Sequence, residues 1–337
     1  MTSSAPTVAL VGATGAAGST VLRVLEDRRF PLRELRTLAS PRSVGSTVTF
    51  RGEELPVAVV EASRLHGCDI VFFAAGSATS KEYAPLVAAG GGVAVDKSSY
   101  FRMDPAVPLV VPEVNGERVR EHRGIIANPN CVAIPLAVAL APLHRAFGLR
   151  HLTVATYQAA SGAGRNLVAE LAVQEQDDAA GRVPSNDFYP HVLHRNVIPG
   201  GWRMYGDDTE EEVKVTQEVR RLLELPELGV GITTVRVPVA VAHAAAVWVE
   251  LETDADPATA RRILESAPGV RVLDDPATQA YPTPREVAGS DEVHIGRIRR
   301  DPSREHGLAL FVVADNLRKG AATNAVQVAE LVLEGRR

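Results

Sequence analysis

The first 130 residues contain a series of short, largely apolar runs, and this series constrains the fold more than any other feature. Five runs have this character: TVALVG (7–12), ELRTLAS (34–40), CDIVFFAAG (68–76), GGVAVDKSS (91–99) and PLVVPEVN (108–115). A helical pattern lies near 16–27. Apolar strands separated by helices are typical of a parallel sheet that is covered on both faces. We therefore expect a doubly wound α/β domain.

From about residue 150 the sequence changes to longer runs in which apolar and polar residues alternate. The clearest are LTVATYQAAS (152–161), GITTVRVPVAVAHAAAVWVELE (231–252) and LALFVVADN (308–316). Alternation over these lengths predicts a mostly antiparallel sheet with one solvated or interface face. The tail has apolar residues at helical spacing. We expect a first domain at 1–130, an α+β domain at 131–316, and a helix at 317–337 that completes the first.

Composition excludes several classes of function. The chain has 337 residues and a net charge of -5 without any basic run, which argues against nucleic-acid binding. No stretch approaches the roughly 18 apolar residues of a membrane helix, and the start, MTSSAPTVALVG, lacks the charged region of a signal peptide. The two cysteines, Cys68 and Cys131, have no metal-type neighbours at CxxC or CxxH spacing. We expect a cytoplasmic protein that binds no metal, membrane or nucleic acid.

A glycine-rich segment, GATGAAG, follows the first apolar run and opens the first helix. Backbone N–H groups and the positive end of the helix dipole can hold a pyrophosphate there. Glycines at this spacing also make ordinary strand-to-helix turns, but the position between strand and helix favours a dinucleotide. The residues expected to contact it are Gly12, Thr14, Gly15, Ala16, Ala17 and Gly18.

The end of the second apolar run indicates which dinucleotide binds. An NAD site places Asp or Glu there to accept a hydrogen bond from the ribose 2′-hydroxyl. This chain has ASPRS instead, with Ser40, Arg42 and Ser43. A guanidinium and two hydroxyls suit a 2′-phosphate, so NADP is expected. The alternative is a solvated turn with an incidental arginine.

The segment NPNCVAIPLAVALAPLH surrounds Cys131. A helix that begins just after the cysteine would place Pro135 in its first turn, where a missing N–H does no harm. A thiol at a helix N-terminus has a stabilised thiolate, and the amides there can bind an oxyanion. The two flanking asparagines, Asn128 and Asn130, would hold the turn. This pattern predicts a nucleophile, although a buried cysteine often serves only packing.

Two further polar residues lie in the apolar stretch TTVRVPVAVAHAAAV. His243 is surrounded there by apolar residues, so its imidazole must either have hydrogen-bond partners within the core or serve as a proton shuttle. Arg236 lies seven residues upstream and suits the grip of a carboxylate. The alternative for Arg236 is an ion pair with a neighbouring acid.

Ten segments of the chain, in order, resemble those of the aspartate-β-semialdehyde dehydrogenase family. They are GATGAAG, ASPRS, SSYFR, NPNC, YQAASGAG, NVIP, EEEVK, RVPVAVAH, GRIR and ADNLRKGAA. The resemblance covers nearly the whole chain. It implies an N-terminal NADP-binding domain of the Rossmann type, a C-terminal catalytic and dimerisation domain, and a homodimer or homotetramer that binds a small-molecule substrate and phosphate.

The resemblance also implies roles for single residues. Cys131 matches the nucleophile, His243 the general acid/base, and Gln158 and Asn130 the residues beside the thiol. The residues that match substrate contacts are Arg236 for the α-carboxylate, Glu211 for the amino group, and Arg102 and Lys214 for phosphate. The residues that match further cofactor contacts are Ser161, Gly162 and Asn316.

The implied reaction is reversible. In the biosynthetic direction Cys131 attacks β-aspartyl phosphate, phosphate leaves, and a thioester forms. Hydride from NADPH then gives a thiohemiacetal, which collapses to aspartate semialdehyde while His243 moves the proton.

Four positions depart from the family's usual residues. Val132 stands where the family has Ser or Thr, Ala242 and Ala244 flank the histidine in place of Gly and Ser, and Lys97 replaces an Asn. These changes fit either drift within the family or a paralogue that acts on a related semialdehyde or acyl phosphate.

Two different functions fit the residues less well. An N-acetylglutamyl-phosphate reductase has similar chemistry, but an acetylated amine has no use for Glu211. A non-catalytic paralogue that only binds a nucleotide needs no nucleophile or acid/base, and the presence of Cys131, Gln158, Arg236 and His243 together argues against it.

Overall fold

The computed structural model describes residues 5–335. Two compact units are present: one holds the described residues up to Asn130 and those from Ala321 onward, and the other is Cys131–Gly320. Residues 1–4, which belong to the segment from which the absence of a signal peptide was expected, and 336–337, the end of the expected tail helix, lie outside the described range. Among residues 5–335, no helix has the length and apolar character needed to cross a membrane.

The first unit contains a parallel sheet with the strand order β5-β2-β1-β6-β7-β8. Its strands are β1 (Thr7–Val11), β2 (Glu34–Ala39), β5 (Ala58–Val59), β6 (Ile70–Phe73), β7 (Val93–Asp96) and β8 (Ile125–Ala127). The predicted doubly wound arrangement is confirmed, with the order reversing between β1 and β6. Ligands of such sheets bind at the carboxyl ends of the strands beside this reversal.

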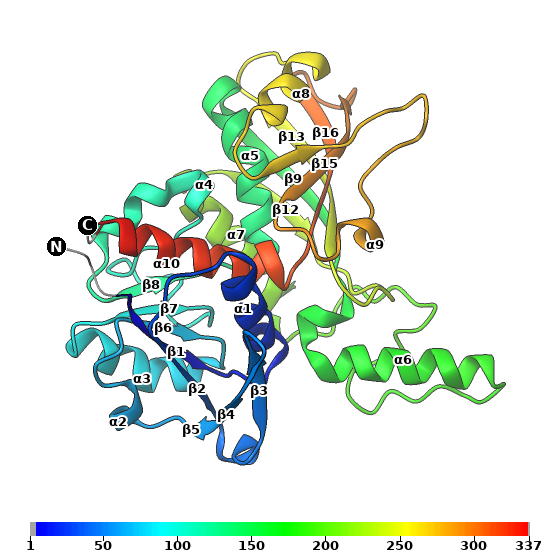
Figure 1. Ribbon diagram of the computed structural model, residues 1–337. Helices are drawn as coiled ribbons and strands as arrows, with labels where there is room; N and C mark the ends of the chain where they lie inside the picture. Colours follow the sequence, from blue (N-terminus) through cyan, green and yellow to red (C-terminus); the bar gives the residue numbers. More distant parts are fainter. Residues whose placement is uncertain (1–4, 336–337) are drawn as a thin grey trace. The chain divides into compact units, whose positions relative to one another are not determined.

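Helices cover both faces of this sheet (Figure 1). The first, α1 (Ala16–Asp27), and the last, α10 (Thr323–Gly335), pack against each other and share one hydrophobic core with the strands. On the other face lies α3 (Ser77–Ala89), which contacts β6, β7 and β8. The unit also contains β3 (Thr47–Phe50), β4 (Glu53–Pro56), α2 (Ala62–Leu65), α4 (Pro112–Asn115) and two 3-10 helices, Pro41–Ser43 and Gly116–Glu121.

One expected strand of the first unit, 108–115, is wrong. Only a single bridge, Leu109 to Ala127, is present, and α4 begins at Pro112. The two prolines explain the difference, because Pro108 has no N–H to donate to a neighbouring strand and Pro112 suits the first position of a helix. The edge strand of the sheet is instead β8, just before the asparagines near Cys131.

The second unit, which the structure describes throughout, contains a six-stranded mixed sheet of order β12-β9-β13-β16-β15-β14. The strands are β9 (Leu149–Tyr157), β12 (Gly229–Thr233), β13 (His243–Leu251), β14 (Val270–Val272), β15 (Val293–Arg300) and β16 (Gly307–Ala314). The central pairs are antiparallel, as predicted, and the two edge strands pair in parallel.

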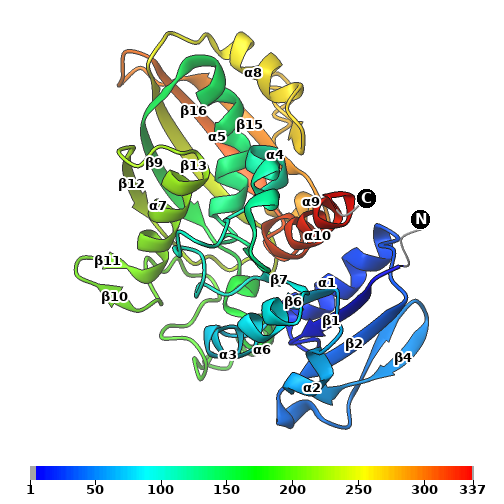
Figure 2. The same cartoon turned by 90° about the vertical axis from the view of Figure 1, so that its left-hand side faces the viewer.

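One face of this sheet is buried against α5 (Ala133–Phe147), as the strands and helix in Figure 2 show. The helices α7 (Glu210–Leu222) and α8 (Pro257–Glu265) pack on α5 in turn. The long helix α6 (Arg165–Ala179) lies apart from the sheet and packs on a small separate core (Figure 1). Short elements complete the unit: β10 (Met204–Tyr205), β11 (Asp208–Thr209) and α9 (Pro284–Val287).

The run 231–252 is not one continuous stretch of strand, contrary to the expectation from its alternating pattern. β12 ends at Thr233 and β13 begins at His243. Between them, Arg236 pairs with the main chain of Gln158 on one side and Ile198 on the other. Pro238 cannot extend a ladder because it has no N–H. His243 therefore begins a strand next to an irregular segment, instead of lying in the middle of a strand.

Candidate active site

The structure requires two of the three glycines in the loop after β1, Gly12 and Gly18, but not Gly15. Gly12 has φ +89°, and a Cβ there would lie 2.7 Å from the carbonyl oxygen of Ala74. A Cβ on Gly18 would lie 2.1 Å from the carbonyl oxygen of Gly12, so the helix packs closely on the loop. Gly15 has φ −77° and room for a Cβ. Nothing within the loop requires a glycine at position 15, which suits the close approach of a ligand.

The groups of the nucleotide loop fit a dinucleotide phosphate. The N–H groups of Ala16, Ala17 and Gly18 form the first turn of α1 and have no carbonyl one turn back in the helix. Such a helix start attracts a phosphate anion. Thr14 and Ser43 lie together, with 3.1 Å between their hydroxyl oxygens, which joins the glycine loop to the turn after β2.

Arg42 lies in the same turn, within a short 3-10 helix at Pro41–Ser43 that follows Ser40. Its side chain is exposed, and within residues 5–335 it has no ion-pair or hydrogen-bond partner. The second strand ends without an acid, because Ala39 is followed by Ser40. This arrangement leaves a guanidinium available to an anion beside the glycine loop.

Cys131 begins the second unit, two residues before α5, and is half-buried. The predicted helix after the cysteine is confirmed, and Pro135 is its third residue. Gly320 packs on the cysteine, since a Cβ there would lie 3.3 Å from the Cβ of Cys131. The other cysteine, Cys68, is buried in the first unit, and burial raises the pKa of its thiol.

Gln158 and Glu211 form a buried polar pair. The Nε2 of Gln158 donates to the Oε1 of Glu211 at 3.0 Å, and the Thr156 hydroxyl donates to the Oε1 of Gln158 at 3.1 Å. Glu211 is held there because α7 begins with a capping box between Thr209 and Glu212. The amide of Gln158 is therefore fixed in direction, and Glu211 presents a carboxylate at the start of a helix.

His243 is buried, with 4% of its surface exposed. Its Nδ1 accepts a hydrogen bond from the backbone N–H of Ala159 at 2.9 Å. An amide N–H can only donate, so Nδ1 is unprotonated and the neutral ring has its proton on Nε2. Within residues 5–335, Nε2 has no hydrogen-bond partner. The imidazole thus presents a buried N–H donor that the described chain leaves unsatisfied.

The charge state of His243 follows from the same surroundings. Burial lowers its pKa well below the usual value, and the positive charge of Arg236 lowers it further. Protonation would also place a second N–H against the amide of Ala159. His243 is therefore neutral near neutral pH.

Arg236 is a cation with 2% of its surface exposed. Its Nη1 donates to the carbonyl oxygen of Ala159 at 2.7 Å, and its Nε donates to the Tyr189 hydroxyl at 3.4 Å. The ring of Trp202 lies 4.7 Å from the guanidinium carbon. Within residues 5–335 no carboxylate forms an ion pair with Arg236, so the alternative of a neighbouring acid is not supported. A buried cation without an acid is costly unless an anion binds it.

Gly162 packs directly on the side chains of Arg236 and His243. A Cβ at this position would lie 2.9 Å from Nη1 of Arg236 and 2.9 Å from Nε2 of His243. The absence of a side chain keeps the space beside Nε2 open.

Ser161 and Asn316 fix the backbone beside His243. The Oδ1 of Asn316 accepts from the Ser161 hydroxyl at 2.9 Å and from the N–H of Ala242 at 3.0 Å. Ala242 has φ +74°, a left-handed conformation that favours glycine. The glycine usual in the family at this position is thus explained by the backbone, and this chain accommodates an alanine there.

Val132 and Ala244, two of the residues that depart from the family's usual ones, line a small cavity together with His243. Its volume is about 10 Å³, close to the least that a water molecule can occupy. Both residues are apolar where the family has hydroxyls, so they offer no side-chain hydrogen-bond partner on this side of the imidazole.

The expected phosphate contacts are divided between the two units. In the first unit, Arg102 is buried and donates to the carbonyl oxygens of Asn128 and Lys97, at 3.0 and 2.6 Å. Asn130 is buried at the end of that unit. In the second unit, Lys214 pairs with Glu210 at 2.6 Å, one turn away on α7.

Sequence reasoning missed three residues of the site. Ala159 holds His243 through its N–H and Arg236 through its carbonyl oxygen, and no sequence signal marks such backbone contacts. Tyr189 and Trp202 pack on Arg236. A weak signal was present for Trp202, because one of only two tryptophans lies in the polar, glycine-rich segment PGGWR.

Known proteins match both units. Residues 7–122 match the model described as semialdehyde dehydrogenase, NAD binding domain, and residues 140–319 match semialdehyde dehydrogenase, dimerisation domain. An aspartate-semialdehyde dehydrogenase of Synechocystis sp. is 45% identical over 97% of both chains. That of Aquifex aeolicus is 46% identical over 97% of this chain and 98% of its own.

A solved structure agrees with these matches. Aspartate semialdehyde dehydrogenase II of Vibrio cholerae, complexed with ASA, has a TM-score of 0.94 and 41% identity over 98% of this chain and 99% of its own. Fold and sequence similarity agree, and the chain belongs to the aspartate-semialdehyde dehydrogenase family.

Proposed function

We propose that the protein converts β-aspartyl phosphate to aspartate semialdehyde, reversibly, with NADP and through a thioester on Cys131. The observation that carries the proposal is the pair of buried donors around Gly162. Among residues 5–335, the Nε2–H of His243 has no hydrogen-bond partner and the guanidinium of Arg236 has no acid beside it. Burying such a pair is costly, and an anionic ligand bound beside it would offset that cost. Membership of the family supports the same conclusion.

Cys131 attacks the acyl carbon as a thiolate, and the carbon–sulfur bond forms as the carbonyl π electrons move to oxygen. The oxyanion then collapses and expels phosphate, which leaves a thioester. A bound nicotinamide cofactor supplies a hydride in this direction and accepts one in reverse. The resulting tetrahedral oxyanion on Cys131 collapses, and the thiolate leaves as the aldehyde forms.

His243 stabilises the oxyanion in these steps. Its neutral ring has one proton, on Nε2, because Nδ1 accepts from Ala159. A preorganised donor in a dry site stabilises developing charge more strongly than water does. Full proton transfer at Nε2 would require Nδ1 to take up a proton and lose its bond to Ala159. Hydrogen-bond donation is therefore the main part of the acid/base role assigned to His243.

The substrate carries three charged groups, and the proposal gives each a partner. Arg236 binds the α-carboxylate, and Glu211 binds the ammonium while Gln158 directs the carbonyl beside the thiol, with Asn130 next to it. Arg102 and Lys214 bind the phosphate. Charge-assisted bonds of this kind are the stronger hydrogen bonds of a site. Lys214 must exchange its bond with Glu210 for the phosphate.

NADP is the proposed form of the cofactor. The helix start at Ala16–Gly18 would hold the pyrophosphate, and Arg42 with Ser40 and Ser43 would hold the 2′-phosphate. Ser161 and Gly162 would approach the nicotinamide, with Asn316 fixing their loop. Support comes from the absence of an acid after β2 and of any partner for Arg42 within residues 5–335.

A homodimer or homotetramer is proposed for the assembly. The face of the second unit's sheet opposite α5 carries Tyr157, Trp248 and Phe311, which register places on the same side. Tyr157 is 38% exposed and its ring lies 6.1 Å from that of Phe311. Half-buried aromatic residues of this kind are typical of interface cores. Light scattering of the wild type and of Trp248→Glu measures the assembly directly.

Turnover assays test the proposed activity. Aspartate semialdehyde, phosphate and NADP should give NADPH, measured by absorbance, and Cys131→Ser should not. N-acetylglutamate semialdehyde serves as the control substrate and should give no NADPH. Turnover of the acetylated substrate alone would contradict the proposal.

A second candidate is a substrate related to aspartate semialdehyde. The small cavity lined by Val132 and Ala244 supports it, because two hydroxyls usual in the family are missing beside His243. Restoring them in the variant Val132→Thr/Ala244→Ser distinguishes the two candidates. Under drift, kcat/KM for aspartate semialdehyde rises or stays equal, whereas under altered specificity it rises while that for an alkylated semialdehyde falls.

A further inference from the structure

We infer that Trp202, together with Tyr189, is a positioning residue that fixes the guanidinium plane of Arg236 for the substrate's carboxylate. The inference rests on the proposed function, since it gives that carboxylate its partner. Neither aromatic residue belongs to the segments from which the site was predicted. Both lie on the connection between α6 and α7.

The main chain first brings this connection to Arg236. The N–H of Ile198 donates to the carbonyl oxygen of Arg236 at 2.9 Å, and the N–H of Arg236 donates to that of Ile198 at 2.8 Å. This reciprocal pair anchors the connection only four residues before Trp202. The position of the indole is therefore set by a short piece of chain.

A tight turn then returns Trp202 to the guanidinium. Gly201 has φ +89°, and a Cβ there would lie 2.0 Å from the Tyr189 hydroxyl oxygen. Tyr189 in turn donates from this hydroxyl to the carbonyl oxygen of Gly200 at 3.1 Å. Only glycine satisfies both the backbone angle and the contact at position 201. The turn at Gly201 and the side chain of Tyr189 therefore fix each other's position.

The two aromatic rings and two hydrogen bonds determine how the guanidinium is oriented. Trp202 lies 4.7 Å and Tyr189 5.8 Å from its central carbon. Nε donates to Tyr189 and Nη1 to Ala159, whereas Nη2 donates to none of residues 5–335. Guanidinium donors lie in one plane, so a ring packed on the group controls the direction of those that remain. A carboxylate needs that direction to be right.

The same arrangement couples the anchor to the reacting end of the substrate. Ala159 bonds both Arg236 and His243. A guanidinium that swings away from Trp202 would lose its bond to the carbonyl oxygen of Ala159, the residue whose N–H holds the imidazole. Trp202 therefore acts through Arg236, without contact to the reacting atoms.

The test distinguishes the contribution of the aromatic face of Trp202 from that of its size. Trp202→Leu keeps an apolar side chain without a π face, and Trp202→Phe keeps the face. The desolvated stack predicts that Leu raises KM for aspartate semialdehyde about tenfold, equivalent to roughly 1.4 kcal/mol. Phe should restore most of this loss, and kcat and the cofactor KM should hardly change.

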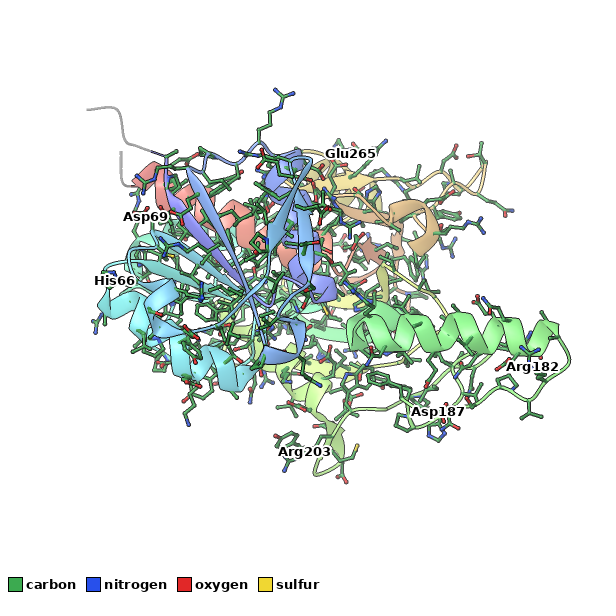
Figure 3. The ribbon with its side chains drawn as sticks, turned by 60° about the horizontal axis from the view of Figure 1, so that its bottom comes forward. His66, Asp69, Arg182, Asp187, Arg203 and Glu265 are labelled. Atoms are coloured by element: carbon green, nitrogen blue, oxygen red, sulfur yellow. The ribbon has the colours of Figure 1, made fainter. Side chains whose placement is uncertain are left out.

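Tyr205→Leu is the matched control. Tyr205 packs on Arg203 at 5.2 Å in the same way, but both residues are exposed, and Arg203 projects from the edge of the second unit in Figure 3. This variant should leave every kinetic constant unchanged. An unchanged KM in Trp202→Leu would overturn the inference. Equal effects of Leu and Phe would show that only bulk matters, and equal loss for substrate and cofactor would indicate a role in the fold.

A binding measurement keeps the inference distinct from the proposed activity. The variant Cys131→Ser/Trp248→Phe does not turn over and has Trp202 as its single tryptophan. Aspartate semialdehyde, added without phosphate or cofactor, should change its emission saturably, and Arg236→Leu should abolish the change. Binding by calorimetry without an emission change overturns the inference alone. Wild-type enzyme without turnover refutes the proposed function, whatever the emission shows.

Discussion

The glycine loop offers a matched pair of substitutions, Gly15→Ala and Gly18→Ala, with opposite expected consequences. A methyl group at Gly18 would lie 2.1 Å from the carbonyl oxygen of Gly12 and 2.9 Å from the Cα of Ala13. Both neighbours are backbone atoms next to a buried strand, so the helix itself must move. Overpacking of this kind costs typically about 1–3 kcal/mol, and better helix propensity returns at most about 1 kcal/mol. Gly18→Ala should therefore lose free energy of unfolding.

At Gly15 the same methyl group meets only the carbonyl oxygen of Gly12, at 3.4 Å, an ordinary contact. Its φ of −77° suits alanine. Alanine makes the unfolded chain less flexible, which raises the free energy of unfolding by about 0.4–1 kcal/mol. The loss of the glycine N-cap lowers it by a similar amount. The free energy of unfolding should stay within about 0.5 kcal/mol of the wild type. The methyl group would, however, stand where a pyrophosphate approaches the helix start. Displacing it should weaken cofactor binding about tenfold, or roughly 1.4 kcal/mol.

Urea unfolding followed by circular dichroism and cofactor titration followed by calorimetry separate the two effects. Gly15→Ala should unfold like the wild type and bind NADP weakly, whereas Gly18→Ala should unfold at lower urea. Unchanged NADP affinity in a folded Gly15→Ala protein would refute the placement of the pyrophosphate over α1. Equal destabilisation of the two variants would refute the packing argument.

Three other predictions follow from the site. Arg42→Ala should lose roughly 10- to 150-fold in NADP affinity, the range for one charge-assisted bond, with NAD kinetics unchanged; equal loss of both cofactors would mean that Arg42 supports the loop. Iodoacetamide at neutral pH should label Cys131 and not Cys68, because burial raises the pKa of the Cys68 thiol, and mass spectrometry of Cys131→Ser shows which thiol reacts. The pKa of His243 is lowered in the folded state, so its contribution to stability is present above pH 6.5 and is lost as pH falls, by up to about 1.4 kcal/mol for each pH unit. Urea unfolding of His243→Asn should therefore show a weaker pH dependence below pH 6.5. A pH dependence identical to that of the wild type would contradict the buried neutral imidazole.

Features set by local sequence were predicted well. The runs at 7–12, 34–40, 68–76 and 91–99 contain β1, β2, β6 and β7. Short runs that are apolar throughout are typical of strands buried on both faces of a sheet, so their position could be predicted. The helix after Cys131 was also predicted, from its proline and its apolar spacing. The resemblance to the family assigned Gln158 to one site with residues far along the chain, which spacing alone cannot indicate.

Non-local contacts explain what the sequence could not show. The run 231–252 reads as one strand, but its middle part bonds to the main chain of Gln158 and Ile198, and nothing near Arg236 in the sequence announces this. The tautomer of His243 depends on an amide 84 residues away. Trp202 meets Arg236 only because Gly201 turns the chain back. Contacts of this kind depend on the completed fold, so the local sequence gives at most a weak sign of them.

The buried charge of Arg236 has a consequence for any attempt to improve the protein's robustness. An apolar replacement would spare the empty enzyme the cost of an unaccompanied cation, so a search for heat-resistant variants would tend to discard this arginine. Under the proposed role of Arg236, such variants would be more stable and would bind the substrate weakly. The natural arginine would have the opposite effect: it costs stability in the empty enzyme, and a bound carboxylate would shift the equilibrium toward the folded form.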